Sequence, residues 1–144
     1  MSNHAYTQEF PSKTLRLISN VRVIHDGKYW ETKALWDTGA TISCIATCLV
    51  KEIGLPVHSE MILSSVTNDE RADQYRVTVM LSSANVMLKD LLVASKDIDR
   101  QGIGFIIGMD IISKGDFALS NAEDKTVLTV RFPSQGITDY TKDL

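Results

Sequence analysis

The chain has 144 residues, of which 44% are hydrophobic and 23% charged, and its formal net charge is −3. This length fits one compact domain and is too short for two independent ones. The acidic balance argues against nucleic-acid binding, which needs a basic face, and no apolar run approaches the roughly 20 residues that cross a bilayer. We therefore expect a single domain that binds neither nucleic acid nor membrane.

The cysteine content is low. Cys44 and Cys48 are the only two cysteines, and no histidine lies near them in the sequence. A disulfide framework or a zinc site needs more members than this. We therefore expect no metal ion and no cofactor. The N-terminus has no basic segment followed by an apolar one, which predicts the absence of a secretory signal and a reducing, cytoplasmic location.

The first predicted element is a β-hairpin. Residues 1–13 are polar and show no pattern, which predicts a flexible N-terminal arm. From Thr14 to Ile24 the apolar residues recur mostly at every second position, the period of a strand with one buried face. Asp26-Gly27 is typical of the turn of a hairpin, and Tyr29–Trp36 is the predicted second strand.

A polar turn, Asp37-Thr38-Gly39-Ala40, follows that strand and leads into a second apolar stretch, 41–45. Ala46–Ile53 then has the pattern of a short helix. Gly54 follows it and predicts the end of the helix, because glycine readily adopts the left-handed conformation found there.

The middle of the chain predicts a long hairpin and a further strand. Residues 61–63 and 75–81 are apolar or alternate between apolar and polar, as strands do. The segment between them, 64–74, is polar and charged and is therefore the predicted tip of the hairpin. Another strand is predicted over 86–94.

The last third of the chain completes an all-β pattern. Gly102–Gly115 predicts a buried strand, a glycine turn and a very short helix, and a final hairpin pairs 117–120 with 126–132. Residues 133–144 are the predicted C-terminal tail. Since most elements are strands, we expect a single all-β domain over residues 14–132, with one or two short helices.

The triplet Asp37-Thr38-Gly39 is a candidate catalytic motif because of its surroundings. Asp37 directly follows the apolar end of a strand, Ala34-Leu35-Trp36, and precedes a glycine turn. A carboxylate in this position would project from a rigid, poorly solvated loop, where acid–base chemistry is favoured. On their own, the three residues favour a simpler interpretation, a turn in which Asp37 accepts a backbone N–H two residues further on.

A second motif, Phe105-Ile106-Ile107-Gly108, changes that balance. The chain thus supplies, in order, an apolar strand that ends in Asp37-Thr38-Gly39-Ala40, then Ser43, then a hydrophobic-hydrophobic-Gly motif before a short helix. With these motifs, residues 14–132 resemble a retropepsin-like aspartic protease. The stretch Gly108–Phe117 is especially similar to bacterial and phage-associated members of that family.

The resemblance implies a closed, barrel-like acid protease fold and a homodimer. Peptide hydrolysis by carboxylates alone needs two of them close together and sharing one proton. This chain has one Asp in the required setting, so each subunit would give one catalytic Asp37 to a site on a two-fold axis. The resemblance also implies supporting roles in the active-site loop for Thr38, Gly39, Ala40 and Ser43, and packing beneath that loop for Ile106, Ile107 and Gly108.

Other acidic and nucleophilic residues are weaker candidates. Asp110 is the rival source of a second carboxylate, but it falls in the first turn of the predicted short helix, where the helix dipole favours negative charge. Asp116 is assigned to a turn. No histidine stands in a plausible relation to Ser43 or Cys44, which disfavours a nucleophilic triad.

The charged hairpin tip occupies the place of the family's flap, the lid that closes over a bound peptide. Retroviral flaps are rich in glycine, whereas residues 64–74 contain none. An exposed hairpin end without a lid role therefore remains an alternative. The candidate flap residues are Val66, Thr67, Asn68, Asp69, Glu70 and Arg71.

The sequence thus predicts an aspartic endopeptidase that acts on peptide or protein substrates. A non-catalytic peptide-binding or assembly module with the same fold remains open, and two features favour it slightly: the glycine-free flap, and Trp36, which is bulkier than the aliphatic residue usual before the Asp. A third possibility is self-processing, with the arm 1–13 as the target.

Overall fold

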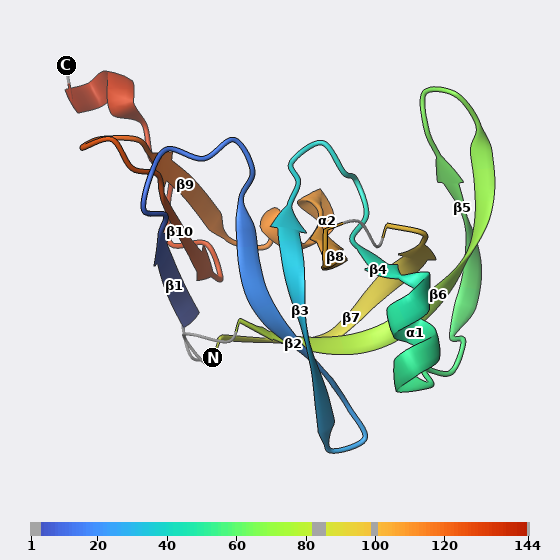
Figure 1. Ribbon diagram of the computed structural model, residues 1–144. Coiled ribbons are helices and arrows are strands. Elements are labelled where there is room, and N and C mark those ends of the chain that lie inside the picture. The colour runs from blue at the N-terminus through green and yellow to red at the C-terminus, as the bar shows by residue number, and fades with distance from the viewer. Residues whose placement is uncertain (1–3, 82–85, 99–100, 144) are drawn as a thin grey trace.

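The structure is a computed structural model that describes residues 4–81, 86–98 and 101–143. Its strands form two sheets, and its helices are short (Figure 1). The strands are β1 (His4–Glu9), β2 (Ile18–His25), β3 (Lys28–Trp36), β4 (Cys44–Ala46), β5 (Ser59–Ser64), β6 (Asp69–Leu81), β7 (Val86–Lys96), β8 (Ile103–Ile107), β9 (Asp116–Ser120) and β10 (Val127–Phe132). The helices are α1 (Thr47–Ile53), α2 (Met109–Ile112) and the 3-10 helix η1 (Tyr140–Asp143).

Six strands of the larger sheet close into a barrel. They lie in the order β2-β3-β8-β4-β7-β6, and a further pairing of β2 with β6 joins the two ends. Closure leaves no open edge in this ring, which protects its backbone groups from unwanted pairing. β5 pairs only with β6 and continues the sheet outside the ring, where the two strands form a projecting hairpin (Figure 1). The predicted all-β, barrel-like fold is confirmed.

The first hairpin forms as its sequence predicts. β2 and β3 pair antiparallel from Ile18 opposite Leu35 to His25 opposite Lys28. Both turn residues have positive φ, 56° at Asp26 and 74° at Gly27, as a two-residue hairpin turn requires. The inward side chains Val21 and Val23 are fully buried in the barrel core.

The helices are also close to their predicted positions. α1 ends at Ile53 and is capped by Gly54, whose φ of 78° is left-handed and whose N–H donates to the carbonyl of Val50 at 2.9 Å. α2 occupies a single turn directly after Gly108. None of the helices in the described part of the chain has the length and apolar character needed to cross a bilayer.

The N-terminus differs from the prediction. Within the predicted flexible arm 1–13, His4–Glu9 form β1, which pairs antiparallel with β10. The sequence does not predict this strand because β1 lies at the edge of a three-stranded sheet and has no apolar alternation. Only Tyr6 buries an apolar side chain there, and the neighbouring Gln8 is polar but hydrogen-bonded within the protein.

The long hairpin also extends further than expected. Ser64 and Asp69–Gln74 belong to β5 and β6, so the turn is reduced to residues 65–68. Asp69, Glu70 and Arg71 are exposed because this end of the hairpin projects beyond the barrel. A strand without a buried face carries no hydrophobic alternation, which is why its sequence is typical of a loop.

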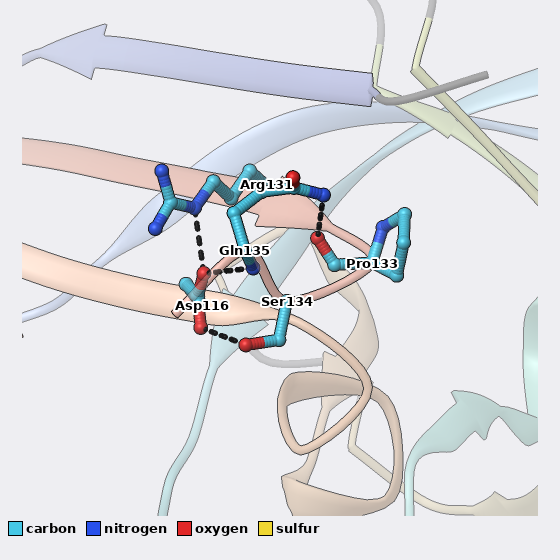
Figure 2. Close-up of polar contacts among 5 residues, drawn as sticks. All are labelled: Asp116, Arg131, Pro133, Ser134 and Gln135. Carbon is cyan, nitrogen blue, oxygen red and sulfur yellow. Dashed lines mark hydrogen bonds and ion pairs between the residues drawn. The ribbon is translucent and has the colours of Figure 1, made fainter. Parts of the chain in front are cut away.

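The second sheet, in the order β1-β10-β9, packs beside the barrel and carries the C-terminal segment. Asp116, predicted as a turn residue, is the first residue of β9. Figure 2 shows its carboxylate accepting hydrogen bonds from Arg131 Nε at 2.6 Å, Ser134 Oγ at 2.5 Å and Gln135 N at 2.8 Å. The hydrogen bonds from Ser134, Gln135 and Arg131 lower the pKa of Asp116 to about 2. Asp116 therefore fastens the start of the predicted tail to this sheet.

Candidate active site

Asp37 lies at the carboxyl end of β3. Its backbone N–H donates to the carbonyl of Ile107 at 2.8 Å, and its own carbonyl accepts from the N–H of Ala40 at 3.1 Å. Its Oδ1 accepts from the N–H of Gly39 at 2.9 Å. The turn interaction predicted from the triplet therefore exists, and it holds the carboxylate of the candidate catalytic residue in a defined orientation.

Thr38 and Gly39 form the exposed tip of this loop. A Cβ added at Gly39 would lie 3.2 Å from Asp37 Oδ1, tighter than an ordinary contact, so a side chain there would crowd the carboxylate. The loop therefore presents Asp37 beside open backbone, and a water molecule or a peptide can approach it closely.

The second predicted motif lies directly beneath this loop. β3 and β8 run parallel, with Trp36 opposite Ile107. Gly108 follows β8 and touches the loop backbone: a Cβ there would lie 2.8 Å from the carbonyl oxygen of Ala40. The N–H of Met109 donates to that same oxygen at 2.7 Å. The two motifs, distant in the sequence, therefore form one unit.

Ser43 and Asp110 join the two motifs a second time. The buried Ser43 Oγ accepts from the N–H of Gly108 at 2.9 Å and donates to Asp110 Oδ1 at 2.7 Å. The N–H of Ser43 also points at both Asp110 oxygens, at 3.1 and 3.0 Å. Asp110 does lie in the first turn of α2, as predicted, but its contact with Ser43 was missed, since a pair 67 residues apart leaves no local signal.

Cys44 follows Ser43 but has the properties of a structural thiol. It is 6% exposed, and burial raises its pKa, an effect that the positive charge of Lys96 opposes and the carboxylates of Asp110 and Asp37 reinforce. A thiol that stays protonated is a poor nucleophile. Among the described residues, no group of three or more His, Cys, Asp or Glu side chains is placed to hold a metal ion.

The candidate flap is the turn and the adjoining strand ends of the β5–β6 hairpin. Figure 1 shows this hairpin rising on the same side of the barrel as the loop after β3. The N–H of Ser65 closes the turn on the carbonyl of Asn68 at 2.9 Å, and the Ser65 hydroxyl donates to the same carbonyl at 2.9 Å. Val66 and Thr67 are exposed at the tip. Hydrogen bonds from Ser65 therefore stabilise this turn, which contains no glycine.

An apolar surface connects the hairpin to the Asp37 loop. Met61 and Leu63 on β5 pack against a small cluster formed by Cys44, Ala72 and Ala94. Ile42, Ile98 and Ile106 pack against the same cluster and remain partly exposed. Ile107, by contrast, is fully buried. Partly exposed apolar side chains between the hairpin and the loop are suited to contact an apolar ligand.

Asp37 is partly exposed in the single chain. One surface hollow of about 340 Å³ lies at the base of the hairpin, and Glu60, Arg71 and Lys96 are in its lining. Another, of about 360 Å³, is lined by residues such as Ile24, Arg76 and Lys89. Asp37 lines neither of them. Thr38 and Gly39 beside Asp37 are exposed, so the loop that carries the candidate catalytic carboxylate is accessible in the single chain.

Comparisons with known proteins agree with this geometry. The sequence profile of the family described as aspartyl protease matches residues 21–111, which include both motifs. No curated protein sequence matches the chain. In structure the chain is similar to a retropepsin-like aspartic protease from Rickettsia conorii, with a TM-score of 0.58, 14% identity and coverage of 91% of this chain and 96% of that one.

It is also similar to EIAV protease complexed with the inhibitor HBY-793, with a TM-score of 0.51, 19% identity and coverage of 68% of this chain and 86% of that one. At these identities the likeness establishes the fold, which is retropepsin-like. The family match covers most of the barrel, from within β2 to Ile111 in α2. The chain therefore belongs to the aspartyl protease family.

Proposed function

We propose that this protein is an aspartic endopeptidase that works as a two-fold homodimer, each subunit contributing Asp37. The observation that carries the proposal is the placement of the partly exposed Asp37 directly after β3, with its carboxylate oriented by the N–H of Gly39 at 2.9 Å. One carboxylate cannot serve as both acid and base in a single step. A second copy, with its own Asp37 facing the first across the axis, supplies the missing partner.

In the proposed reaction, a water molecule lies between the two carboxylates. The ionised one removes a proton from the water as its oxygen bonds to the scissile carbonyl carbon, and the protonated one donates to the carbonyl oxygen. In the resulting tetrahedral diol the C–N bond breaks. The protonated carboxyl gives its proton to the leaving nitrogen, and the ionised carboxylate takes a proton from one diol hydroxyl, so the pair again holds one proton. The products are a carboxylic acid and an amine. Thr38, exposed at the loop tip, would form a hydrogen bond across the two-fold axis to the same loop of the second subunit.

The proposed substrate is a peptide in extended conformation. The β5–β6 hairpin would lie over it, with Val66, Thr67 and Asn68 at the tip and Asp69, Glu70 and Arg71 on the adjoining strand. An extended peptide can pair with backbone groups of the hairpin and of the loop after Gly39. The partly exposed side chains Ile42, Leu63 and Ile106 favour apolar substrate side chains near the cleaved bond.

Peptide cleavage tests this proposal. The purified protein, incubated with a mixed peptide library between pH 4 and 7, should cut peptides, with the fastest cleavage at mildly acidic pH, where two coupled carboxylates share one proton. Asp37→Asn should abolish cleavage while the mass in solution stays that of a dimer. A variant that still cuts would contradict the role of Asp37, and binding without any cleavage would select the non-catalytic module.

Two details bear on the alternatives. The bulk of Trp36 favoured a non-catalytic module. However, Trp36 is only 4% exposed and pairs with Ile107 of β8, so the protein accommodates its side chain in the core beside the Asp37 loop. Self-processing within β1 requires this strand to leave its pairing with β10, because a scissile segment must enter the site extended and unpaired. Mass spectrometry of aged protein would reveal a shortened N-terminus.

A further inference from the structure

A chain of hydrogen bonds leads from the N-terminal strand to the residue before Asp37. The indole Nε1 of Trp36 donates to Ser19 Oγ at 2.9 Å, and Ser19 Oγ donates to Gln8 Oε1 at 2.6 Å. Tyr6 on β1 donates its hydroxyl to the same Gln8 oxygen at 2.7 Å. Gln8 Nε2 donates to the carbonyl of Ile18 at 2.9 Å. Three strands, β1, β2 and β3, thus meet in one polar chain.

Three of the side chains in this chain of hydrogen bonds are buried. Ser19 is 1% exposed, Trp36 4% and Tyr6 5%. Among the described residues, no buried side-chain nitrogen or oxygen lacks a partner. A buried polar group that loses its partner costs free energy comparable to that of a lost hydrogen bond, so each member of the chain fixes the next. The amide of Gln8 therefore sets the orientation of the Ser19 hydroxyl, which in turn holds the indole.

Trp36 connects these hydrogen bonds to Asp37, the next residue. Its backbone N–H donates to the carbonyl of Leu17 at 2.9 Å, and the next N–H, that of Asp37, donates to Ile107 at 2.8 Å. Its ring also packs on Phe117 of β9, with 5.9 Å between the ring centroids. The indole is thus held on one side by a hydrogen bond and on another by β9. The side chain and the backbone of the residue that precedes Asp37 are therefore both held in place.

From this arrangement we propose that Gln8 is a positioning residue for Asp37, acting through Ser19 and Trp36. The N-terminal strand then does more than complete the second sheet: it determines how well the carboxylate is aligned. The effect on turnover rests on the proposed protease function, whereas the effect on the Asp37 loop does not. A small misplacement of a catalytic group lowers the rate of the chemical step more than it lowers binding.

The test uses three variants of the full chain. Gln8→Leu removes the amide but keeps the size of the side chain, and Trp36→Phe removes the indole N–H but keeps a ring against Phe117. The matched control is Thr7→Val, which removes the exposed hydrogen bond of 2.9 Å between Thr7 and Thr129 on the opposite face of β1. All three are compared by unfolding in denaturant, so that a general loss of β1 is recognised.

Two readouts separate positioning from stability. In peptide cleavage, Gln8→Leu and Trp36→Phe should each lower kcat about ten-fold with little change in KM. The double variant should be no worse than either single one, because both break the same chain. Thr7→Val should leave kcat unchanged. Equal losses in Thr7→Val, or additive losses in the double variant, would overturn the proposal.

The second readout needs no cleavage. In a nitrogen-15 NMR spectrum, Gln8→Leu should shift the indole signal of Trp36 and the amide signals of Asp37 and Gly39, and Thr7→Val should not. If those signals stay in place, the proposal fails even when the wild-type protein cuts peptides. If they move while the wild-type protein cuts nothing, the proposed function fails and the structural coupling stands.

Discussion

At the scale of single residues, Gly108 is the position where the fold and the candidate site constrain each other most directly. The backbone of the Asp37 loop occupies the space that a side chain would need: a Cβ would lie 2.8 Å from Ala40 O and 3.0 Å from the carbonyl carbon of Ile42. Neither neighbour is a flexible side chain that could move aside. Only glycine lets β8 and the loop approach this closely.

We therefore predict that Gly108→Ala destabilises the fold by about 1–3 kcal/mol, the usual cost of forcing extra volume into a packed interior. The measurement is the free energy of unfolding in urea. In the variant, the backbone N–H at position 108 should also exchange faster with solvent. In the wild-type protein this N–H donates to Ser43 Oγ at 2.9 Å, and the added methyl group forces the two apart.

Gly54→Ala is the control. Gly54 has a φ of 78°, but a Cβ there would meet nothing within 4 Å. Its cost is therefore conformational alone, about 1 kcal/mol, and it should leave exchange at Gly108 unchanged. If Gly108→Ala were as stable as the wild-type protein, the two motifs could not be packed as closely as these contacts require.

The same residues show what a sequence reveals about a site. The places of Asp37, Gly39 and Gly108 in the fold could be predicted because each stands in a local pattern, a strand end beside a glycine turn. The contact of Ser43 with Asp110 could not, because 67 residues separate the two and neither has a local feature that points to the other. The sequence shows only that the two motifs follow each other in this order, which does not predict the contact between Ser43 and Asp110.

At the scale of elements, prediction succeeds where one face of a strand is buried. The β2–β3 hairpin has alternating apolar residues and an Asp-Gly turn, and it forms with the predicted turn. β1 and the outer half of β6, residues 69–74, were not predicted as strands for the same reason: each buries only one side chain, Tyr6 and Ala72. Their partners, β10 and β5, give them their structure, and partners are not local information.

The attachment of the C-terminal segment to β9 is an element-scale feature that depends on pH. The pKa of Asp116 is lowered from 3.8 to about 2 by hydrogen bonds from Ser134, Gln135 and Arg131. Because the folded pKa lies below the unfolded one, the stabilisation by this carboxylate is complete above pH 3.8 and is lost as the pH falls towards 2. The attachment is therefore intact throughout the mildly acidic range proposed for catalysis.

We predict that Asp116→Asn releases residues 133–135 at neutral pH, as the wild-type protein does only near pH 2. Limited proteolysis and hydrogen exchange of the Gln135 N–H, followed from pH 7 to pH 2, measure this release. Wild-type exchange should rise only below pH 4, whereas exchange in the variant should be fast and nearly independent of pH after correction for the intrinsic rate.

Asp139→Asn supplies the control. The pKa of Asp139 is also lowered, by hydrogen bonds from the Thr141 hydroxyl and N–H, but these lie within its own exposed segment. This variant should leave the Gln135 profile of the wild-type protein unchanged. Slow exchange at Gln135 in Asp116→Asn would show that the segment is held by something other than this carboxylate.

At the scale of the whole molecule, the single chain supplies one candidate catalytic carboxylate, that of the partly exposed Asp37. The sequence predicts the need for a second copy by counting, since one Asp stands in the required setting. It cannot predict how the copies meet, because the terminal strands here pair within one chain: β1 with β10, and β10 with β9. An interface in which these strands exchange between subunits would have to break those pairings.

The proposed shared site makes a quantitative prediction for mixtures of subunits. If each active site needs Asp37 from both subunits, the inactive Asp37→Asn chain captures wild-type chains in inactive mixed dimers. In an equal, co-refolded mixture, roughly half of the wild-type activity should remain per wild-type chain, and roughly one tenth in a nine-fold excess of the variant. Co-refolding with equal amounts of an unrelated protein controls for losses in refolding. A catalyst whose site lies within one chain would keep its full activity at every ratio, so the titration curve itself decides between one carboxylate per site and two.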